Sequence, residues 1–394
     1  MVNSKIDLLK LRASYGLSGN EDIGNYTAQQ TYSSQNLLGM QGLVRNGIGN
    51  DQLQWEQVKK LNVGVDMALM KERLQFSVDV YQNKTDKLIT YESLPSAAGF
   101  DYVVSNSGAL KTTGLELSLT YRVINKKNLK WDAGFNLGKS KSTITLLPGS
   151  QILTSFSGAT YASQVGGAPN EFYGYQANGV YVSDAAAAQD GLSIRNLNGT
   201  LTSFKGGDIK FADLNADKVI DDNDKKSLGS PNPNFFGSFT NKFTYKRFSL
   251  STLFTFSSGN KIFNYTRSQL EGMSNVYNQT NAVLNRWKTN GQVTSIPKAA
   301  WGDPMGNSRF SSRWIEDGSY LRLRAVTFSY DVPFNPGFFK YATVYASGNN
   351  LLTLTNYKGY DPEFSATESI FGQGVDNTLE PQFKSVQIGF RLGF

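Results

Sequence analysis

Long stretches in which apolar and polar residues alternate one by one constrain this chain more than any other feature. In 57–69 and again near the C-terminus, every second residue is apolar: Leu61, Val63, Val65, Met67, Leu69, then Val386, Ile388, Phe390, Leu392, Phe394. Successive side chains of a β-strand point to opposite faces, so this pattern is typical of strands with one apolar and one polar face. It predicts about ten strands, at 6–16, 57–69, 73–84, 113–123, 129–140, 237–246, 248–257, 320–330, 341–349 and 384–394.

One predicted strand changes phase. In 320–330 the alternation shifts by one residue near Ala325. A β-bulge, which inserts one extra residue into a strand, would restore the pattern. With a bulge there, the apolar residues of the strand share one face: Leu321, Leu323, Val326, Phe328 and Tyr330.

The connections between these strands alternate between short and long. The short ones are 70–72, 124–128, 247 and 331–340, and the long ones are 17–56, 85–112, 141–236, 258–319 and 350–383. A soluble β-sandwich also buries one face of each strand, but it gives no reason for this alternation. A transmembrane barrel does, because its periplasmic turns are short and its extracellular loops long. The sequence therefore predicts an all-β chain that forms an antiparallel transmembrane β-barrel wall with long extracellular loops.

Composition excludes several other classes. The chain of 394 residues has no cysteine and no histidine, which removes disulfides, thiolate metal sites and imidazole catalysis. Aromatic residues make up 13%, which favours strands. The net charge of +7 is spread along the chain, so it predicts solvated loops and no nucleic-acid partner. No apolar run is long enough for a transmembrane helix, and no secretory signal is evident.

One acidic segment, 213–224, has a spacing of oxygen donors similar to an EF-hand loop. Side-chain oxygens and one carbonyl fall at positions 1, 3, 5, 7, 9 and 12 of that spacing: Asp213, Asn215, Asp217, Val219, Asp221 and Asp224. Lys218 stands where an EF-hand has glycine, and Asp224 replaces the bidentate glutamate. The segment predicts a calcium site, and a solvated acidic loop with Asx turns is the alternative.

Two further groups of residues have a functional and a structural interpretation. Four arginines would form a ligand-facing basic patch or ordinary lumen charge, and the second is the commoner case: Arg309, Arg313, Arg322 and Arg324. Six loop aromatics would stack on sugars or pack the loops, and packing is favoured: Tyr161, Phe172, Tyr173, Tyr175, Trp287 and Trp301.

Several blocks, in order along the chain, resemble the SusC/RagA class of TonB-dependent nutrient transporters. They are 8–16 (LLKLRASYG) with 18–20 (SGN), 55–56 (WE) with 62–66 (NVGVD), 79–88 (DVYQNKTDKL), 107–110 (SGAL) with 113–117 (TGLEL), 207–211 (GDIKF) through 229–233 (GSPNP), and 349–353 (NNLLT) with 357–363 (YKGYDPE). The resemblance spans essentially the whole chain.

The resemblance implies a C-terminal part of a barrel of about 22 strands. On this interpretation residues 1–394 are a partial barrel domain that lacks the plug domain and the N-terminal strands. The resemblance implies TonB-dependent import of a glycan or peptide across the bacterial outer membrane. It also implies a SusD-like surface lipoprotein, the TonB complex and outer-membrane lipid as partners, with TonB reached through the missing N-terminal part.

Two other classes of function remain as alternatives. No pair of carboxylates stands in a recognisable hydrolase frame, so we expect no enzyme activity. A soluble or surface carbohydrate-binding β-protein, with loop aromatics as platforms, is the principal alternative. The sequence does not identify the substrate.

Overall fold

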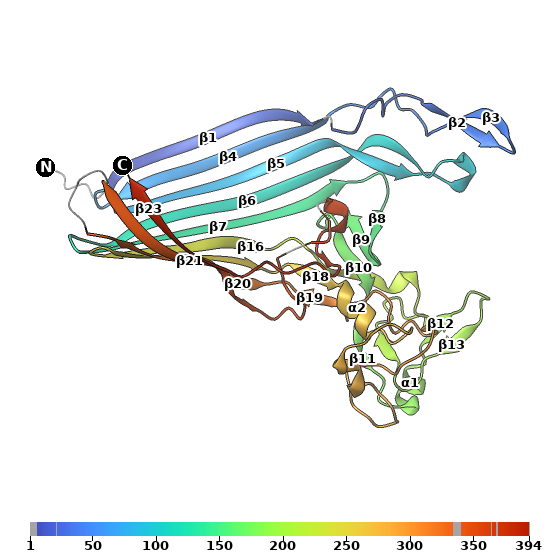
Figure 1. Ribbon diagram of the computed structural model, residues 1–394. Coiled ribbons are helices and arrows are strands. Elements are labelled where there is room, and N and C mark those ends of the chain that lie inside the picture. Colours follow the sequence, from blue (N-terminus) through green and yellow to red (C-terminus); the bar gives the residue numbers. More distant parts are fainter. Residues whose placement is uncertain (1–5, 21, 334–339, 364, 368, 394) are drawn as a thin grey trace.

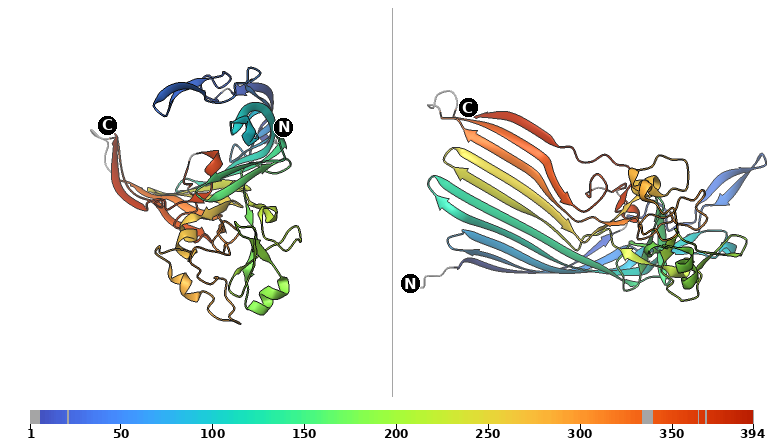
Figure 2. Two further views of the ribbon diagram at one scale, coloured as in Figure 1. Left: turned by 90° about the vertical axis from the view of Figure 1, so that its right-hand side faces the viewer. Right: turned by 90° about the horizontal axis from the view of Figure 1, so that it is seen from below.

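The computed structural model describes residues 6–20, 22–333, 340–363, 365–367 and 369–393. Its main feature is one ten-stranded sheet that curves like the wall of a barrel (Figure 1, Figure 2). Neighbouring strands are antiparallel throughout, and the outermost are β1 and β23. In spatial order the strands are β1 (Ile6–Asn20), β4 (Glu56–Leu69), β5 (Leu74–Ser93), β6 (Tyr102–Lys126), β7 (Leu129–Leu146), β16 (Phe235–Tyr245), β17 (Phe248–Ser258), β20 (Tyr320–Asp331), β21 (Tyr341–Thr355) and β23 (Ser385–Gly393).

All the predicted strands are present, so the all-β barrel-wall prediction is confirmed. Phe394 and most of the predicted turn 331–340 lie outside the described residues. The prediction of a long loop at 85–112 is wrong, because β5 continues to Ser93 and β6 starts at Tyr102. The two strands extend beyond the alternating segment. There the chain has left the apolar belt, so neither face needs to be apolar, and the pattern used for prediction disappears.

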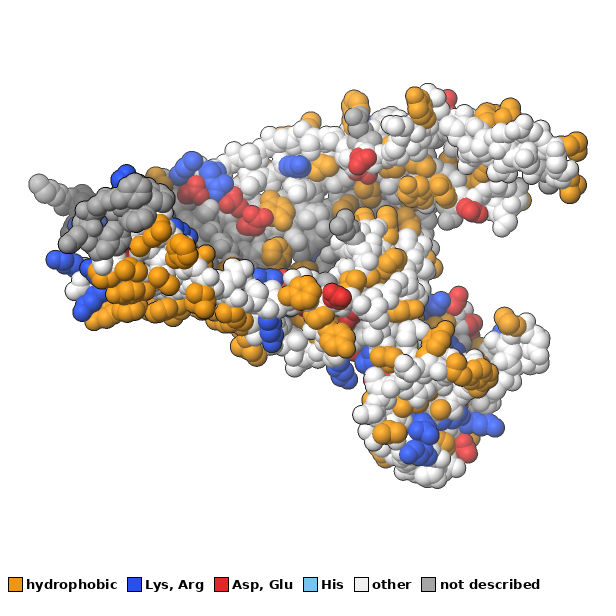
Figure 3. All heavy atoms as spheres, viewed as in Figure 1, with side chains coloured by type: hydrophobic (Ala, Val, Ile, Leu, Met, Phe, Trp, Pro, Cys, Tyr) orange, Lys and Arg blue, Asp and Glu red, His pale blue; other side chains and the backbone are white. Residues whose placement is uncertain are grey.

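The register aligns apolar side chains across the whole wall. One row runs directly across nine adjacent strands and contains only apolar residues: Leu9, Met67, Phe76, Leu119, Phe135, Phe239, Phe254, Leu323 and Leu352. Many side chains of this face are exposed, among them Leu11 at 75% and Ile388 at 81%. Figure 3 shows hydrophobic side chains gathered over the outer side of the sheet near the short turns. An apolar surface of this extent on a curved sheet fits a lipid-facing wall.

The predicted bulge in β20 lies at Arg324. Leu323 pairs with Phe254 and Ala325 with Leu253, so Arg324 has no partner in β17 and is the extra residue. Against β21 the register also shifts at this point, where Asn350 and Leu351 lie opposite Arg324. Leu321 and Leu323 therefore share the outer face with Val326 and Phe328, as the sequence predicts.

The long connections fold into small units beyond one end of the wall (Figure 1). The first carries a hairpin of β2 (Tyr32–Leu37) and β3 (Met40–Arg45), while the β5–β6 connection is short and carries only the helix η1 (Ser96–Ala98). The third carries β8 (Gln151–Phe156), β9 (Ala159–Gln164), β10 (Glu171–Tyr175), β11 (Ala177–Val180), α1 (Asp184–Asp190), β12 (Ser193–Arg195), β13 (Leu201–Ser203), β14 (Ile209–Phe211), η2 (Asp222–Asp224) and β15 (Lys225–Gly229). The last two carry β18 (Lys261–Asn264), α2 (Tyr265–Glu271), η3 (Asn281–Asn285), β19 (Ile315–Asp317), η4 (Ile370–Gly372) and β22 (Val375–Asp376).

Two small hydrophobic cores hold these units together. One is built from the third connection with Met305: Tyr181, Ala187, Leu192, Ile194, Phe204, Ile209, Phe211, Ile220 and Met305. The other joins three connections: Ala159, Tyr161, Phe172, Phe263, Trp314 and Val375. In the part of the chain that the structure describes, no helix has both the length and the apolar character to cross a membrane.

Candidate functional site

The inner face of the wall is polar along the same part of the strands where the outer face is apolar. The row one residue along from the apolar row crosses the same nine strands and contains only polar residues: Lys10, Asp66, Ser77, Ser118, Asn136, Ser238, Thr255, Arg322 and Thr353. Strand side chains alternate between faces, so the two rows lie on opposite sides of the wall. A polar inner surface of this kind is what a lumen for hydrophilic solutes requires.

Arg12 links three strands on this inner face. Its Nε donates to Asp66 Oδ2 at 2.8 Å, and its Nη1 and Nη2 donate to the two oxygens of Asp79 at 2.8 and 2.7 Å. Ser77 Oγ donates to Asp66 Oδ1 at 2.8 Å and completes the cluster. The guanidinium lies over Gly64, where any Cβ would collide with Arg12 and Asp79. Because Gly64 has no side chain, there is room for Arg12 to bind the carboxylates of both Asp66 and Asp79.

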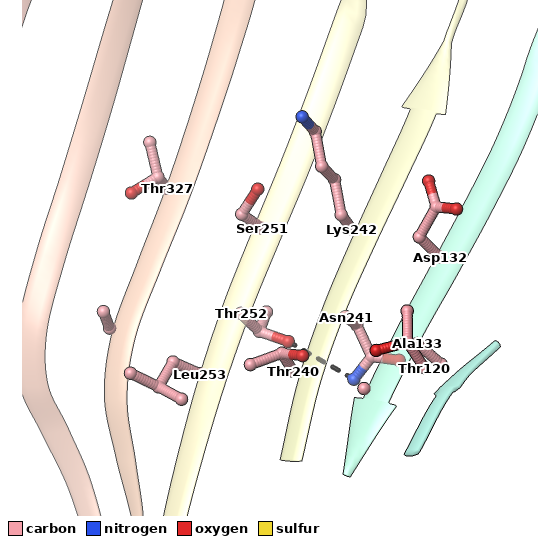
Figure 4. Close-up of a pocket in the computed structure, with 12 residues that line it drawn as sticks. Thr120, Asp132, Ala133, Thr240, Asn241, Lys242, Ser251, Thr252, Leu253 and Thr327 are labelled. Carbon is pink, nitrogen blue, oxygen red and sulfur yellow. Dashed lines mark hydrogen bonds between the residues drawn. The ribbon is translucent and has the colours of Figure 1, made fainter. Parts of the chain in front are cut away.

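A shallow hollow of about 320 Å³ lies on the inner face near the short turns (Figure 4). Its wall is rich in hydroxyl groups and carries one lysine: Thr120, Thr240, Ser251, Thr327 and Lys242. Asp132 beside it is held by Arg122 Nε at 3.0 Å. Small residues create the hollow, namely Gly134 and Ala325. Hydroxyl groups and a cation can donate hydrogen bonds to a polar solute.

A second ionic cluster fastens the last long connection to the inner face. Arg322 in β20 pairs with Asp361 and, at 2.9 Å, with Glu363. Glu363 also pairs with Arg324, the bulge residue. Arg322 and Asp361 are 2% and 4% exposed, so solvent does not screen their attraction. The connection therefore folds back against the lumen wall instead of extending into solvent.

The predicted calcium residues lie in one loop, and their oxygens accept hydrogen bonds from that loop. Asp224 is fully buried; its Oδ1 accepts from Leu214 N at 2.7 Å and its Oδ2 from Asp221 N at 2.9 Å. Asp213 Oδ2 accepts from Lys218 N at 3.0 Å, while Asp213 Oδ1 is buried without a hydrogen-bond partner among the described residues. Asx turns use the remaining side chains, with acceptors Asn215, Asp217 and Asp221.

One feature of the loop favours the calcium prediction and another speaks against it. Lys218 adopts φ of 67°, the left-handed conformation that glycine supplies in an EF-hand. Among the described residues, however, no three acidic side chains come together as a metal-binding group. A cation would have to compete with the backbone N–H donors for these oxygens. Calcium binding stays a prediction, which a titration tests below.

The four arginines do not form a ligand-facing patch, which was the less favoured alternative, and only Arg322 and Arg324 belong to a strand of the wall. Arg309 donates to the carbonyls of Gly306 and Met305 and stacks 4.8 Å from the Tyr175 ring centroid. Arg313 lies 4.2 Å from the ring of Trp314, and burial lowers its pKa to about 10. Arg322 and Arg324 are ion-paired, so all four arginines have interaction partners within the protein.

The loop aromatics mainly pack. Tyr161 and Phe172 are fully buried, with ring centroids 5.0 Å apart. Trp287 donates its indole N–H to Val182 O at 3.1 Å, and its ring covers Gly207. Trp301 is different, because it is 75% exposed.

The sequence did not predict that Arg12 and Asp361 belong to ionic clusters. The available signals were the position of Arg12 on the polar face and that of Asp361 in the 357–363 block.

Comparison with known proteins agrees with this architecture. The profile of the family described as "TonB dependent receptor-like, beta-barrel" matches residues 5–351. A TonB-dependent receptor of Formosa agariphila is 32% identical over 413 residues, covering 100% of this chain and 40% of the relative. The TonB-dependent receptor SusC of Bacteroides thetaiotaomicron is 26% identical over 415 residues, covering 98% and 37%.

Solved structures give the same result. The RagAB peptide transporter matches with a TM-score of 0.77 and 26% identity, covering 99% of this chain and 41% of that chain. The RagAB peptide importer in the open-open state matches with a TM-score of 0.80 and 25% identity, covering 100% and 41%. This chain therefore spans about 40% of the length of the curated relatives it matches. On the profile match, the two-faced wall and these relatives, the chain belongs to the family of TonB-dependent receptor β-barrels of the bacterial outer membrane.

Proposed function

We propose that this chain supplies barrel wall and outer loops to a TonB-dependent outer-membrane importer of nutrient oligomers, either glycans or peptides. The paired apolar and polar rows carry the proposal, because they give one wall a lipid-facing and a lumen-facing side over nine strands. Similarity to SusC and to the RagAB peptide transporter supports import as the activity.

The outer strands of the sheet support a further part of the proposal. β1 and β23 end the sheet, and strand edges in a membrane need hydrogen-bond partners. We propose that residues 1–394 act as part of a larger barrel of about 22 strands, with a plug domain and N-terminal strands outside this segment.

We propose that a SusD-like surface lipoprotein covers the folded loops, and that the TonB complex supplies energy through a part of the receptor outside this chain. The transporter needs no catalytic group of its own, so the proposal includes no enzyme activity. The soluble carbohydrate-binding alternative is weaker, because it would leave the exposed apolar face of the wall in water.

Uptake by cells that carry the full-length gene tests the function. Labelled peptide and glycan oligomers are supplied to cells with the gene, without it, and with the inner membrane de-energised. We expect accumulation of at least one oligomer class only in energised cells with the gene. Uptake that is unchanged by deleting the gene would refute the proposal.

A matched pair of substitutions separates the two faces. Thr240→Phe places a large ring in the inner hollow (Figure 4), whereas Ala346→Phe lies on the apolar face, between Phe328 and Ile388. We expect Thr240→Phe to reduce uptake severalfold and Ala346→Phe to leave it nearly unchanged at equal surface expression. Equal effects of the two would show that the inner face does not line the transport path.

A further inference from the structure

Four exposed cations lie at two short turns at the end of the wall. Lys126 ends β6 and Lys127 begins the turn to β7, while Lys246 and Arg247 form the turn between β16 and β17. We call these four residues the basic rim. Figure 3 shows Lys and Arg side chains at this end beside the hydrophobic outer face.

The turns that carry the basic rim are joined by backbone hydrogen bonds. Lys246 N donates to Asn128 O at 2.8 Å, because β16 pairs directly with β7. Asp331 N, at the end of β20, donates to Arg247 O at 3.0 Å. The two turns that carry the rim are therefore direct neighbours at the end of the wall.

No acidic side chain neutralises the rim. Within the described ranges, no carboxylate lies at ion-pair distance from any of its four cations. The carboxylate of Asp331, the last residue of β20, instead accepts from Thr343 Oγ1 at 2.8 Å. The four like charges lie on adjoining turns and have no anionic partner there, so binding of an anion to them would be favoured electrostatically.

The outer face next to the rim is aromatic. The ring centroids of Trp131 and Phe243 are 5.0 Å apart, and those of Phe248 and Tyr330 are 4.6 Å apart. These four residues and Tyr245 lie on the apolar face of the wall, next to the short turns. We call the five residues the aromatic girdle. Lys246 Nζ lies 5.4 Å from the Tyr245 ring centroid, so the rim directly adjoins the girdle. Amphipathic aromatic rings at such a level mark the membrane interface.

This combination has the chemistry of an amphiphile's binding site. The girdle offers apolar surface for acyl chains, and the rim offers cations for a phosphate at the level where the apolar surface ends. A free phosphate ion would use the cations but not the girdle. Short turns face the periplasm in barrels of this type, and the periplasmic leaflet is made of phospholipid.

We propose that the basic rim and the aromatic girdle form a binding site for anionic phospholipid in the periplasmic leaflet of the outer membrane. The rim cations bind the headgroup phosphate of a lipid such as phosphatidylglycerol, and the girdle packs against its acyl chains. The site is independent of the transported substrate.

The test measures lipid enrichment on the full-length protein. The protein is reconstituted in nanodiscs of equal phosphatidylglycerol and phosphatidylcholine, and lipids that stay bound after release are counted by native mass spectrometry. We expect a severalfold excess of phosphatidylglycerol. The variant with Lys126→Gln, Lys127→Gln, Lys246→Gln and Arg247→Gln should lose that excess.

A matched variant controls for net charge. It replaces four exposed lysines of the loop end, Lys226, Lys288, Lys358 and Lys384, by glutamine and should keep the excess. If the fourfold variant does not fold, the two double variants, one for each turn, are measured instead. Heat-modifiable migration in electrophoresis shows whether each variant has folded. No preference in the unmodified protein, or a preference that survives removal of the rim, would overturn the proposal. Loss of the preference in millimolar inorganic phosphate would assign the site to free phosphate instead and would equally overturn it.

Discussion

Arg322 of β20 and Asp361 of the last long connection form an ion pair in which both side chains are almost completely buried. They are 39 residues apart in sequence, and Asp361 Oδ2 also accepts from Gln382 N at 3.1 Å. The pair thus holds both ends of the segment 361–382 against the lumen wall. This contact couples a connection at the loop end of the wall to the polar face of β20.

Removing one member of this pair should be costly. Arg322→Met leaves Asp361 buried without its partner, and we expect a loss of about 3–5 kcal/mol in stability. Replacing both, as Arg322→Met with Asp361→Leu, should cost less than Arg322→Met alone, because no charge is left unpaired. Thermal unfolding of the full-length protein and protease cleavage within 361–382 measure both variants. A single variant as stable as the unmodified protein would show that the pair does not hold the loop.

Asp224 should be structural whether or not calcium binds. Its carboxylate accepts two backbone N–H groups and closes a capping box with Asp221 around η2. Asp224→Ala leaves these donors unpaired in a buried place, at a cost of about 1–3 kcal/mol. Hydrogen exchange at the amides of Leu214 and Asp221 should speed up strongly. Asn223→Ala, on the exposed side of the same turn, should change neither amide.

Calcium binding to the acidic loop remains to be measured. If the loop binds as extracellular calcium modules do, the dissociation constant lies at about 10⁻⁴–10⁻³ M. Terbium luminescence and calorimetry on the folded protein should then give a signal that disappears in the Asp213→Ala, Asp217→Ala variant. The same signal from both proteins, or none from either well above that range, would leave only an acidic loop with Asx turns.

Acidification should loosen the start of α1. Gly206 N donates to Asp184 Oδ1 at 2.9 Å, and this bond, with that from Asn290, lowers the pKa of Asp184. A carboxyl group with a lowered pKa stabilises the folded state above its unfolded pKa of about 3.9. That contribution is lost as pH falls through the lower, folded pKa.

The amide of Gly206 reports this change. Its protection from hydrogen exchange, corrected for the intrinsic rate at each pH, should fall below about pH 4. In Asp184→Asn the pH-dependent step should vanish. Ser193 N donates to the backbone carbonyl of Lys218, so its protection is the internal reference. A step of equal size in Asp184→Asn would show that another group is responsible.

The sequence predicted the wall because each strand there has a lipid face. Phe239 and Phe254 must alternate with polar neighbours, and the period-two pattern records that requirement. Beyond the membrane the requirement ends, so the extensions of β5 to Ser93 and β6 from Tyr102 carried no pattern.

The loop cores were beyond prediction for a different reason. Phe204, Phe211 and Met305 come from irregular segments far apart in sequence, and no local period brings them together. Sequence placed the acidic residues of 213–224 in one loop correctly. It could not show that buried Asp224 uses both its oxygens on backbone donors, since that depends on the tertiary position of η2.

The orientation of the wall is tested most directly by labelling cysteines on intact cells. The chain has no cysteine, so single substitutions in it introduce the only thiols of this segment. Leu197→Cys lies at the fully exposed tip of the β12–β13 hairpin, and Asn128→Cys lies in the short β6–β7 turn. In the full-length protein, a membrane-impermeant maleimide should label Leu197→Cys on intact cells and Asn128→Cys only after the outer membrane is permeabilised. Labelling of Asn128→Cys but not Leu197→Cys on intact cells would contradict a wall with periplasmic turns and extracellular loops.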